Sequence, residues 1–118
     1  MTVLILYCDG CCALQRRPDT GLLAGLWQFP NFSGTPETAE VIRTVEEMGL
    51  KPSEILLQLE RKHIFTHIEW QMRGVYMEVR EKTPAFCWME LDAVERDAAL
   101  PTAFRQFWTE LPWKPVCP

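Results

Sequence analysis

The segment Ile68–Arg80, with the sequence IEWQMRGVYMEVR, decides the fold because its apolar residues follow the two-residue period of a β-strand. The phase of this pattern changes by one residue at Gly74. The apolar positions are Ile68, Trp70 and Met72 before the glycine, and Val75, Met77 and Val79 after it. Such a change of phase at a glycine is typical of a β-bulge. We therefore predict a long strand over 68–80 with a bulge at Gly74.

Further strands are predicted on both sides of this segment. At the N-terminus, Asp9-Gly10 is a two-residue hairpin signal between two apolar runs, so we predict a hairpin formed by Thr2–Cys8 and Cys11–Arg16. The segment Arg17–Gly25 is rich in turn residues and is predicted to be a loop. The remaining predicted strands are Leu26–Phe29, Ile55–Lys62 and Phe86–Leu91.

The clearest helix is predicted between Thr35 and Gly49. Thr35 is placed as the N-cap, Pro36 as the first helical residue and Gly49 as the stop. One face of this helix is apolar and is expected to pack on a sheet. Its residues are Ala39, Ile42, Val45 and Met48.

Two shorter helices are predicted near the C-terminus. Asp92 and Glu95 resemble a capping pair that opens the first, and Pro101-Thr102 begins the second. The second helix is expected to direct apolar side chains into the core, namely Phe104, Phe107, Trp108 and Leu111. After this helix, we expect residues 112–118 to form a loose tail. Strands and helices mixed in this irregular order predict an α+β fold, with a mixed sheet covered by helices.

Length and composition indicate one soluble globular domain over 1–118. The chain has 118 residues, of which 47% are hydrophobic and 24% are charged. Its net charge of −4 argues against a protein that binds nucleic acid through a large basic face, although a small contact patch remains compatible. The apolar run Val3–Tyr7 is too short to span a membrane, so no membrane association is expected. Because a strand begins almost at Met1, we expect the chain to be a fragment of a longer protein.

The five cysteines do not form the pattern of a structural zinc site. Cys8 and Cys11 have CxxC spacing and lie beside Cys12, but Cys87 and Cys117 are isolated. We interpret them as reduced thiols, most of them on strands, rather than as metal ligands, and predict no metal site. An odd number of cysteines is also typical of a reducing compartment.

Three stretches, in this order and spacing, resemble the C-terminal domain of MutY-type adenine DNA glycosylases. The first comprises Leu14–Pro18 (LQRRP) and Gly21–Asn31 (GLLAGLWQFPN). The second is His63–His67 (HIFTH), and the third is Ala99–Phe104 (ALPTAF). The first stretch is shared with Nudix hydrolases. The resemblance implies a Nudix-like α/β/α sandwich with a mixed, mainly antiparallel sheet.

The same resemblance implies what the parent protein does. MutY-type enzymes remove adenine that is mispaired with 8-oxoguanine, and their N-terminal half carries the catalytic acid and a four-cysteine 4Fe-4S cluster. Neither matches this chain, so the fragment is expected to be non-catalytic and without a cofactor of its own. Its expected partners are double-stranded DNA containing 8-oxoguanine paired with adenine, and the N-terminal catalytic domain of the same protein. The expected location is the cytoplasm, in association with the nucleoid.

The alternative function is that of a stand-alone Nudix-type nucleotide pyrophosphatase. That activity needs several carboxylates on one helix face to hold divalent cations. Glu46, Glu47 and Gly49 match the end of the Nudix motif, but Arg43 occupies the position of one metal-binding carboxylate. The segment from Gly34 to Gly49 is also shorter than the motif requires. These departures argue against catalysis.

The candidate lesion contact is the segment Phe65-Thr66-His67, which resembles the Phe-Ser-His loop of the family. In 8-oxoguanine N7 carries a hydrogen, whereas guanine N7 is an acceptor, and a hydroxyl such as that of Thr66 can accept from the added N–H. The other interpretation is that Thr66 is a turn residue whose hydroxyl bonds local backbone. Phe65 is expected to be a packing anchor rather than a stacking platform.

Further candidates for contacts to DNA are Lys62, His63, Arg16 and Arg17. Each of them is also compatible with an ordinary surface or loop position. A third functional class, a module that docks other proteins, stays open because such domains expose loops for partners.

Overall fold

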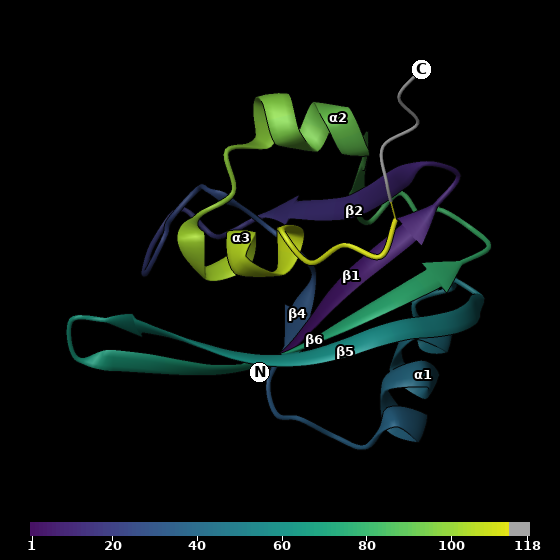
Figure 1. Ribbon diagram of the computed structural model, residues 1–118, viewed down its shortest axis with the longest axis horizontal. Helices are drawn as coiled ribbons and strands as arrows, with labels where there is room; N and C mark the ends of the chain where they lie inside the picture. The colour runs from purple at the N-terminus through teal and green to yellow at the C-terminus, as the bar shows by residue number, and fades with distance from the viewer. Residues whose placement is uncertain (114–118) are drawn as a thin grey trace.

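A seven-stranded mixed sheet with helices on both faces forms the body of the protein in the computed structural model, which describes residues 1–113 (Figure 1). The main path of the sheet has the order β3-β2-β1-β6-β5, while β4 pairs with β1 and β7 with β2. Among the strand pairs within residues 1–113, β1–β6 is the only parallel one. The strands are β1 Thr2–Cys8, β2 Cys11–Arg16, β3 Trp27–Gln28, β4 Asn31–Phe32, β5 Pro52–Phe65, β6 Ile68–Val79 and β7 Cys87–Glu90. The predicted α+β class with a mixed, mainly antiparallel sheet is confirmed.

The first hairpin forms where the sequence predicts it. Strands β1 and β2 have the predicted bounds, and Cys8 pairs with Cys11 across the turn. Asp9 and Gly10 have φ values of 49° and 79°, the positive values that the tight turn of a two-residue hairpin needs.

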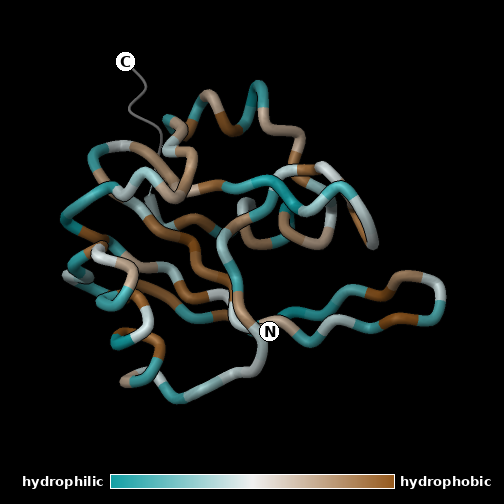
Figure 2. Tube along the Cα trace, turned by 180° about the vertical axis from the view of Figure 1, so that it is seen from behind, coloured by the Kyte–Doolittle hydropathy of each residue, from teal (hydrophilic) through white to brown (hydrophobic). Residues whose placement is uncertain are grey.

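Two clusters of buried side chains cover the two faces of the sheet. The helix α1 (Thr38–Glu47) packs on one face, and the helices near the C-terminus pack on the other (Figure 1). β1 contributes to both clusters because its successive side chains point to opposite faces: Val3 and Ile5 face the C-terminal helices, and Leu4 and Leu6 face α1. Figure 2 shows the resulting hydrophobic run along the central strands.

The predicted bulge at Gly74 is wrong. Gly74 pairs with Leu59 and its neighbour Arg73 pairs with Glu60, so the register is regular there. The irregularities lie in β5 instead, between Pro52 and Glu54 and between Ile55 and Leu57. The apparent phase change arises because β6 enters the centre of the sheet after Gly74, where both of its faces are buried. Val75, Met77 and Val79 face the α1 side, while Met72 and Tyr76 face the other side.

Helix α1 begins later than predicted. Its N-cap is Glu37, which makes no side-chain capping bond, so the prediction of Thr35 as N-cap is wrong. The preceding segment is held outside the helix by hydrogen bonds from Thr2 Oγ1 to the Gly34 carbonyl (2.8 Å) and from Arg73 to the Pro36 carbonyl (3.2 Å). The helix buries Val41 and Val45, with Ile42 and Met48 partly buried, whereas Ala39 of the predicted face is exposed. Gly49, with φ 82°, follows the helix as predicted.

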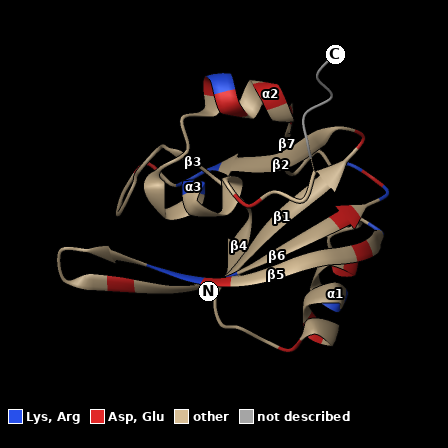
Figure 3. Cartoon of the chain, viewed as in Figure 1, with Lys and Arg blue, Asp and Glu red and all other residues tan. Residues whose placement is uncertain are grey.

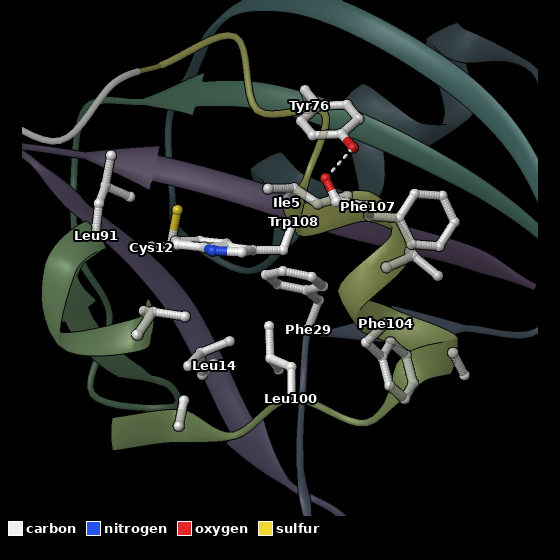
Figure 4. Close-up of a cluster of buried hydrophobic side chains, with 14 of the residues drawn as sticks. Ile5, Cys12, Leu14, Phe29, Tyr76, Leu91, Leu100, Phe104, Phe107 and Trp108 are labelled. Carbon is white, nitrogen blue, oxygen red and sulfur yellow. Dashed lines mark hydrogen bonds between the residues drawn. The ribbon is translucent and has the colours of Figure 1, made fainter. Parts of the chain in front are cut away.

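The C-terminal helices cover the opposite face of the sheet. α2 (Leu91–Ala93) continues into a π-helical turn, η1 (Val94–Ala98), and α3 (Thr102–Trp108) follows. The predicted capping pair is wrong, because Glu90 is the N-cap and Asp92 lies in the first turn. α3 is confirmed and buries Phe104, Phe107 and Trp108 (Figure 4).

The C-terminal tail is packed at least as far as Trp113. The ring of Trp113 is buried and stacks on Tyr7 with ring centroids 4.7 Å apart, so the predicted loose tail is wrong for this residue. Residues 114–118 lie outside the described part of the chain. No helix within residues 1–113 has the length and apolar character needed to cross a membrane.

Candidate nucleic-acid interface

The hairpin of β5 and β6 extends well beyond the rest of the sheet (Figures 1 and 2). The two strands pair without interruption from Leu57 opposite Tyr76 to Phe65 opposite Ile68. Only Thr66 and His67 remain as the turn. The candidate lesion contact therefore occupies the far end of this hairpin, which is defined here as the hairpin tip, residues 65–68.

Thr66 combines an exposed side chain with an unfavourable backbone conformation. Its φ is 45°, in the left-handed region that β-branched residues rarely adopt. None of the hydrogen bonds among residues 1–113 involves its hydroxyl, so the alternative interpretation of a hydroxyl bonded to local backbone gains no support. The turn presents this hydroxyl to solvent.

A row of aromatic rings connects the hairpin tip to the core. His63 meets the edge of Phe65 with ring centroids 4.4 Å apart, Phe65 meets Trp70 at 4.7 Å, and Trp70 meets Phe104 of α3 at 5.9 Å. Phe65 is partly buried in this row. The arrangement supports the predicted role of Phe65 as a packing anchor next to Thr66, since edge-to-face contacts of this kind are favourable.

Arg17 also joins this row. Its guanidinium lies over the Trp70 ring, 5.1 Å from the centroid, and donates to the Leu22 carbonyl (2.9 Å) and to Oε1 of Gln28 (2.8 Å). Burial lowers the pKa of the guanidinium because it removes water from the charged group. The two acceptor oxygens replace part of that lost hydration. The guanidinium of Arg17 is thus engaged in contacts within the protein, although the sequence offered it as a candidate contact to DNA.

Arg16 is engaged elsewhere. Its guanidinium lies over the ring of Trp27, 4.6 Å from the centroid, and donates to the Gly25 carbonyl (3.0 Å). Neither of these partners belongs to the hairpin. The structure therefore separates two neighbouring arginines that the sequence treats alike.

Lys62 and His67 remain accessible. Lys62 is exposed and lies 3.6 Å from Glu69 in an ion pair whose members are both well solvated, so the pair contributes little stability. His67 is exposed in the turn. The structure thus brings Phe65, Thr66, His67 and His63 together at or near the tip.

Trp70 is the residue of this site that the sequence analysis missed. The alternating pattern places it only on the face shared with Ile68 and Met72. The two-residue turn at Thr66-His67 puts Trp70 directly opposite His63 and diagonal to Phe65, and the predicted strands, which end at Lys62 and begin at Ile68, do not specify that turn.

Charged residues of both signs are spread along the chain (Figure 3). On the hairpin, Arg61 and Lys62 lie between the acidic residues Glu60 and Glu69, and Arg73 lies 3.5 Å from Glu60. Lys62 and Arg73 of the hairpin thus each lie beside a carboxylate, so the hairpin does not carry a large basic face.

Three residues that match or replace positions of the Nudix motif lie on α1. Arg43, Glu46 and Glu47 are all exposed. Within residues 1–113, no three side chains of His, Cys, Asp or Glu gather closely enough to hold a metal ion.

Known proteins share both the sequence pattern and the fold. The sequence matches the NUDIX domain family over residues 1–110. It is 30% identical over 105 residues to the adenine DNA glycosylase of Rattus norvegicus and 32% identical over 105 residues to that of Homo sapiens. These alignments cover 79% of this chain but 20% and 19% of the two relatives, so the chain spans about a fifth of their length.

Two solved structures show the same fold at low sequence identity. The DNA mismatch repair protein MutT of methicillin-resistant Staphylococcus aureus, a Nudix hydrolase, has a TM-score of 0.57 at 16% identity, over 93% of this chain and 95% of its own. The ORF135 protein of E. coli has a TM-score of 0.50 at 17% identity, over 96% of this chain and 92% of its own. The predicted Nudix-like fold and the resemblance to adenine DNA glycosylases are confirmed, and the chain belongs to the Nudix domain family.

Proposed function

We propose that this domain recognises 8-oxoguanine opposite adenine in duplex DNA, as the lesion-recognition domain of an adenine DNA glycosylase in base-excision repair. The observation that carries the proposal is the exposed hydroxyl of Thr66 at the end of a hairpin that aromatic contacts anchor to the core. The similarity to adenine DNA glycosylases supports the same role.

The chemistry of the lesion fits a hydroxyl acceptor. The N7–H of 8-oxoguanine donates to the Thr66 oxygen, whereas N7 of guanine has no hydrogen to donate. A hydroxyl can also donate to guanine N7, so discrimination requires its own proton to be committed to a phosphate or a carbonyl of the complex. The methyl group of threonine restricts χ1 and helps to fix the direction of the hydroxyl.

A narrow hairpin is also a suitable shape for the contact, because the major groove of B-DNA admits a two-stranded β-ribbon. His67 and Lys62 are exposed near the tip and could bond phosphate oxygens. Most of the affinity for phosphates would come from another part of the protein, since this chain has a net charge of −4.

The rest of the proposed protein completes the reaction. Its N-terminal catalytic domain, with a catalytic acid and a 4Fe-4S cluster, would remove the flipped adenine while this domain holds the opposite base. The fragment itself would be non-catalytic. We place such a protein in the cytoplasm, in association with the nucleoid.

A binding experiment with matched duplexes tests the proposal. The affinity of the chain is measured for a duplex containing 8-oxoguanine opposite adenine and for one containing guanine opposite adenine, at one salt concentration. One good base contact predicts a preference of roughly 5- to 150-fold for the lesion. Thr66→Ala should remove most of this preference, and the control variant Thr66→Ser should keep it. If Thr66→Ala retains the full preference, Thr66 is structural and the proposal fails.

A further inference from the structure

We propose that Arg17 and Trp70 form a clamp that fixes the hairpin tip and thereby the direction of the Thr66 hydroxyl. The two are positioning residues, because neither is placed to touch the lesion. What the positioned tip recognises rests on the function proposed above, whereas the clamp itself is a property of the free protein.

The clamp consists of contacts from three separate parts of the chain. Trp70 lies between Phe65, next to the turn, and Phe104 of α3. Arg17 covers the Trp70 ring and at the same time bonds the Leu22 carbonyl in the loop and Gln28 in β3. One guanidinium therefore connects the loop 17–25 and β3 to the hairpin.

The hairpin needs such a support because its outer half is a ribbon of two strands. β6 pairs with β1 from Arg73 to Glu78, and the N-terminal amine of Met1 donates to the Gln71 carbonyl (2.6 Å), so the segment from Ile68 to Trp70 pairs with β5 alone. Ile64 and Ile68 are 60% and 48% exposed, which shows how little of the body covers the tip. Isolated two-stranded hairpins are marginally stable in water. The contacts of Trp70 with Phe104 and Arg17 are therefore well placed to hold the tip in one orientation.

Arginine is required at position 17 for a geometric reason. Its planar guanidinium stacks on the ring with one face while its N–H groups donate within the plane, which the ammonium group of lysine cannot do. Arg17→Lys thus keeps the charge but removes the clamp. Arg16 provides a matched control, because it makes a similar contact with Trp27 and a bond to Gly25, away from the hairpin.

Hydrogen exchange in the free protein tests the clamp without DNA. The measured signals are the amides of Phe65 and Ile68, which face each other beside the turn, with the amide of Ile5 in the buried strand β1 as the reference for global unfolding. Arg17→Lys should accelerate exchange at the two tip amides by about 2- to 30-fold, the range expected for loss of one cation–π contact, and leave Ile5 unchanged. Arg16→Lys should leave the tip at the wild-type rate. Wild-type exchange at the tip in Arg17→Lys, or equal acceleration in both variants, would overturn the proposal.

Substitutions of Trp70 provide a second test. Trp70→Ala should accelerate exchange at the tip more than Arg17→Lys does, and Trp70→Phe should restore part of the protection because it retains a ring between Phe65 and Phe104. If Trp70→Phe exchanges as fast as Trp70→Ala, a ring at this position does not hold the tip. Arg17→Lys decides the question independently if Trp70→Ala fails to fold.

The DNA experiment links the clamp to recognition and separates the two possible failures. Arg17→Lys should reduce the preference for the 8-oxoguanine duplex while changing the affinity for the guanine duplex little, because the charge is kept. A loss of affinity for both duplexes by the same factor would mean that Arg17 contributes a general contact to DNA, and the link between the clamp and lesion recognition would fail. Equal affinity of the wild-type protein for the two duplexes would refute the proposed function, whereas the hydrogen-exchange result decides the clamp.

Discussion

The ring of Phe107 lies directly against the backbone of Gly74. A Cβ atom at position 74 would be 2.5 Å from Cδ1 and 2.6 Å from Cε1 of Phe107. Both distances are too short for carbon atoms that are not bonded to each other. Gly74 is therefore required by the approach of α3 to β6. The glycine that the sequence pattern places at a bulge marks the point where a helix meets the sheet.

We expect Gly74→Ala to destabilise the domain by about 1–3 kcal/mol, because the added methyl group forces Phe107 out of its position in a packed core. Urea denaturation measures the free energy of unfolding. The same substitution made together with Phe107→Leu should cost less, since the smaller side chain leaves room for the methyl group. A cost that is the same in both backgrounds would show that the two residues are not coupled.

The thiol of Cys12 should make the stability depend on pH in alkaline solution. Cys12 is fully buried in β2, and burial raises its pKa from 9.0 to about 12. The unfolded chain loses this proton from about pH 9 while the folded chain keeps it, so the free energy of unfolding falls as pH rises between these values. The slope from one group is about 1.4 kcal/mol per pH unit.

Comparison with Cys12→Ala isolates this contribution. Urea denaturation at several values between pH 8 and 10 should give a shallower decline for the variant, with a difference that grows above pH 9. Parallel curves for the two proteins would show that Cys12 does not titrate in this range on unfolding. Burial also raises the pKa of Tyr76, which adds to the decline at still higher pH in both proteins.

We expect the side chain of Thr66 to lower the stability of the domain while it supports recognition of the lesion. Its φ of 45° is costly for a β-branched residue, so Thr66→Gly should raise the free energy of unfolding by up to about 1 kcal/mol. The same variant should lose the preference for 8-oxoguanine because the hydroxyl is absent. Thr66→Val is the matched control, since it keeps the β-branch and should lose the preference without a gain in stability. A destabilised Thr66→Gly variant would show that the turn does not strain threonine.

The chain should not hydrolyse nucleoside triphosphates. Arg43 takes the place of a metal-binding carboxylate, and a cation at this position would repel the divalent ion that the reaction needs. Incubation with oxidised guanosine triphosphate and Mg²⁺ is expected to release no pyrophosphate above the rate without protein. Turnover that depends on protein and Mg²⁺ would establish the alternative function of a nucleotide pyrophosphatase.

Local signals predicted those parts of the fold that local interactions determine. Asp9-Gly10 predicts the first hairpin because these two residue types readily adopt the positive φ values that the two-residue turn needs. The N-terminus of α1 and the regular register at Gly74 depend instead on distant residues. Thr2 and Arg73 hold the segment before α1 outside the helix, and no local pattern contains that information.

Some features of the candidate site likewise follow from the local sequence, and others depend on contacts between distant residues. The position of Thr66 between two strands follows from the predicted strands Ile55–Lys62 and Ile68–Arg80, whereas the continuation of β5 to Phe65 and the resulting two-residue turn do not. The different roles of Arg16 and Arg17 do not follow from the local sequence either, because they depend on which tryptophan each guanidinium meets after folding. Trp70 likewise cannot be distinguished from an ordinary core residue in the sequence, because its contacts with Phe65 and Arg17 form only on folding.

Strand β5 forms an edge of the sheet for all of its 14 residues. A long regular edge of this kind would offer its free backbone groups to a second chain and favour aggregation. The irregularities between Pro52 and Glu54 and between Ile55 and Leu57 interrupt the spacing of those groups, and exposed Glu60 and Lys62 place charges farther along the same edge. The irregular part of β5 thus makes this edge a poorer template for pairing with a second chain than a regular edge of the same length.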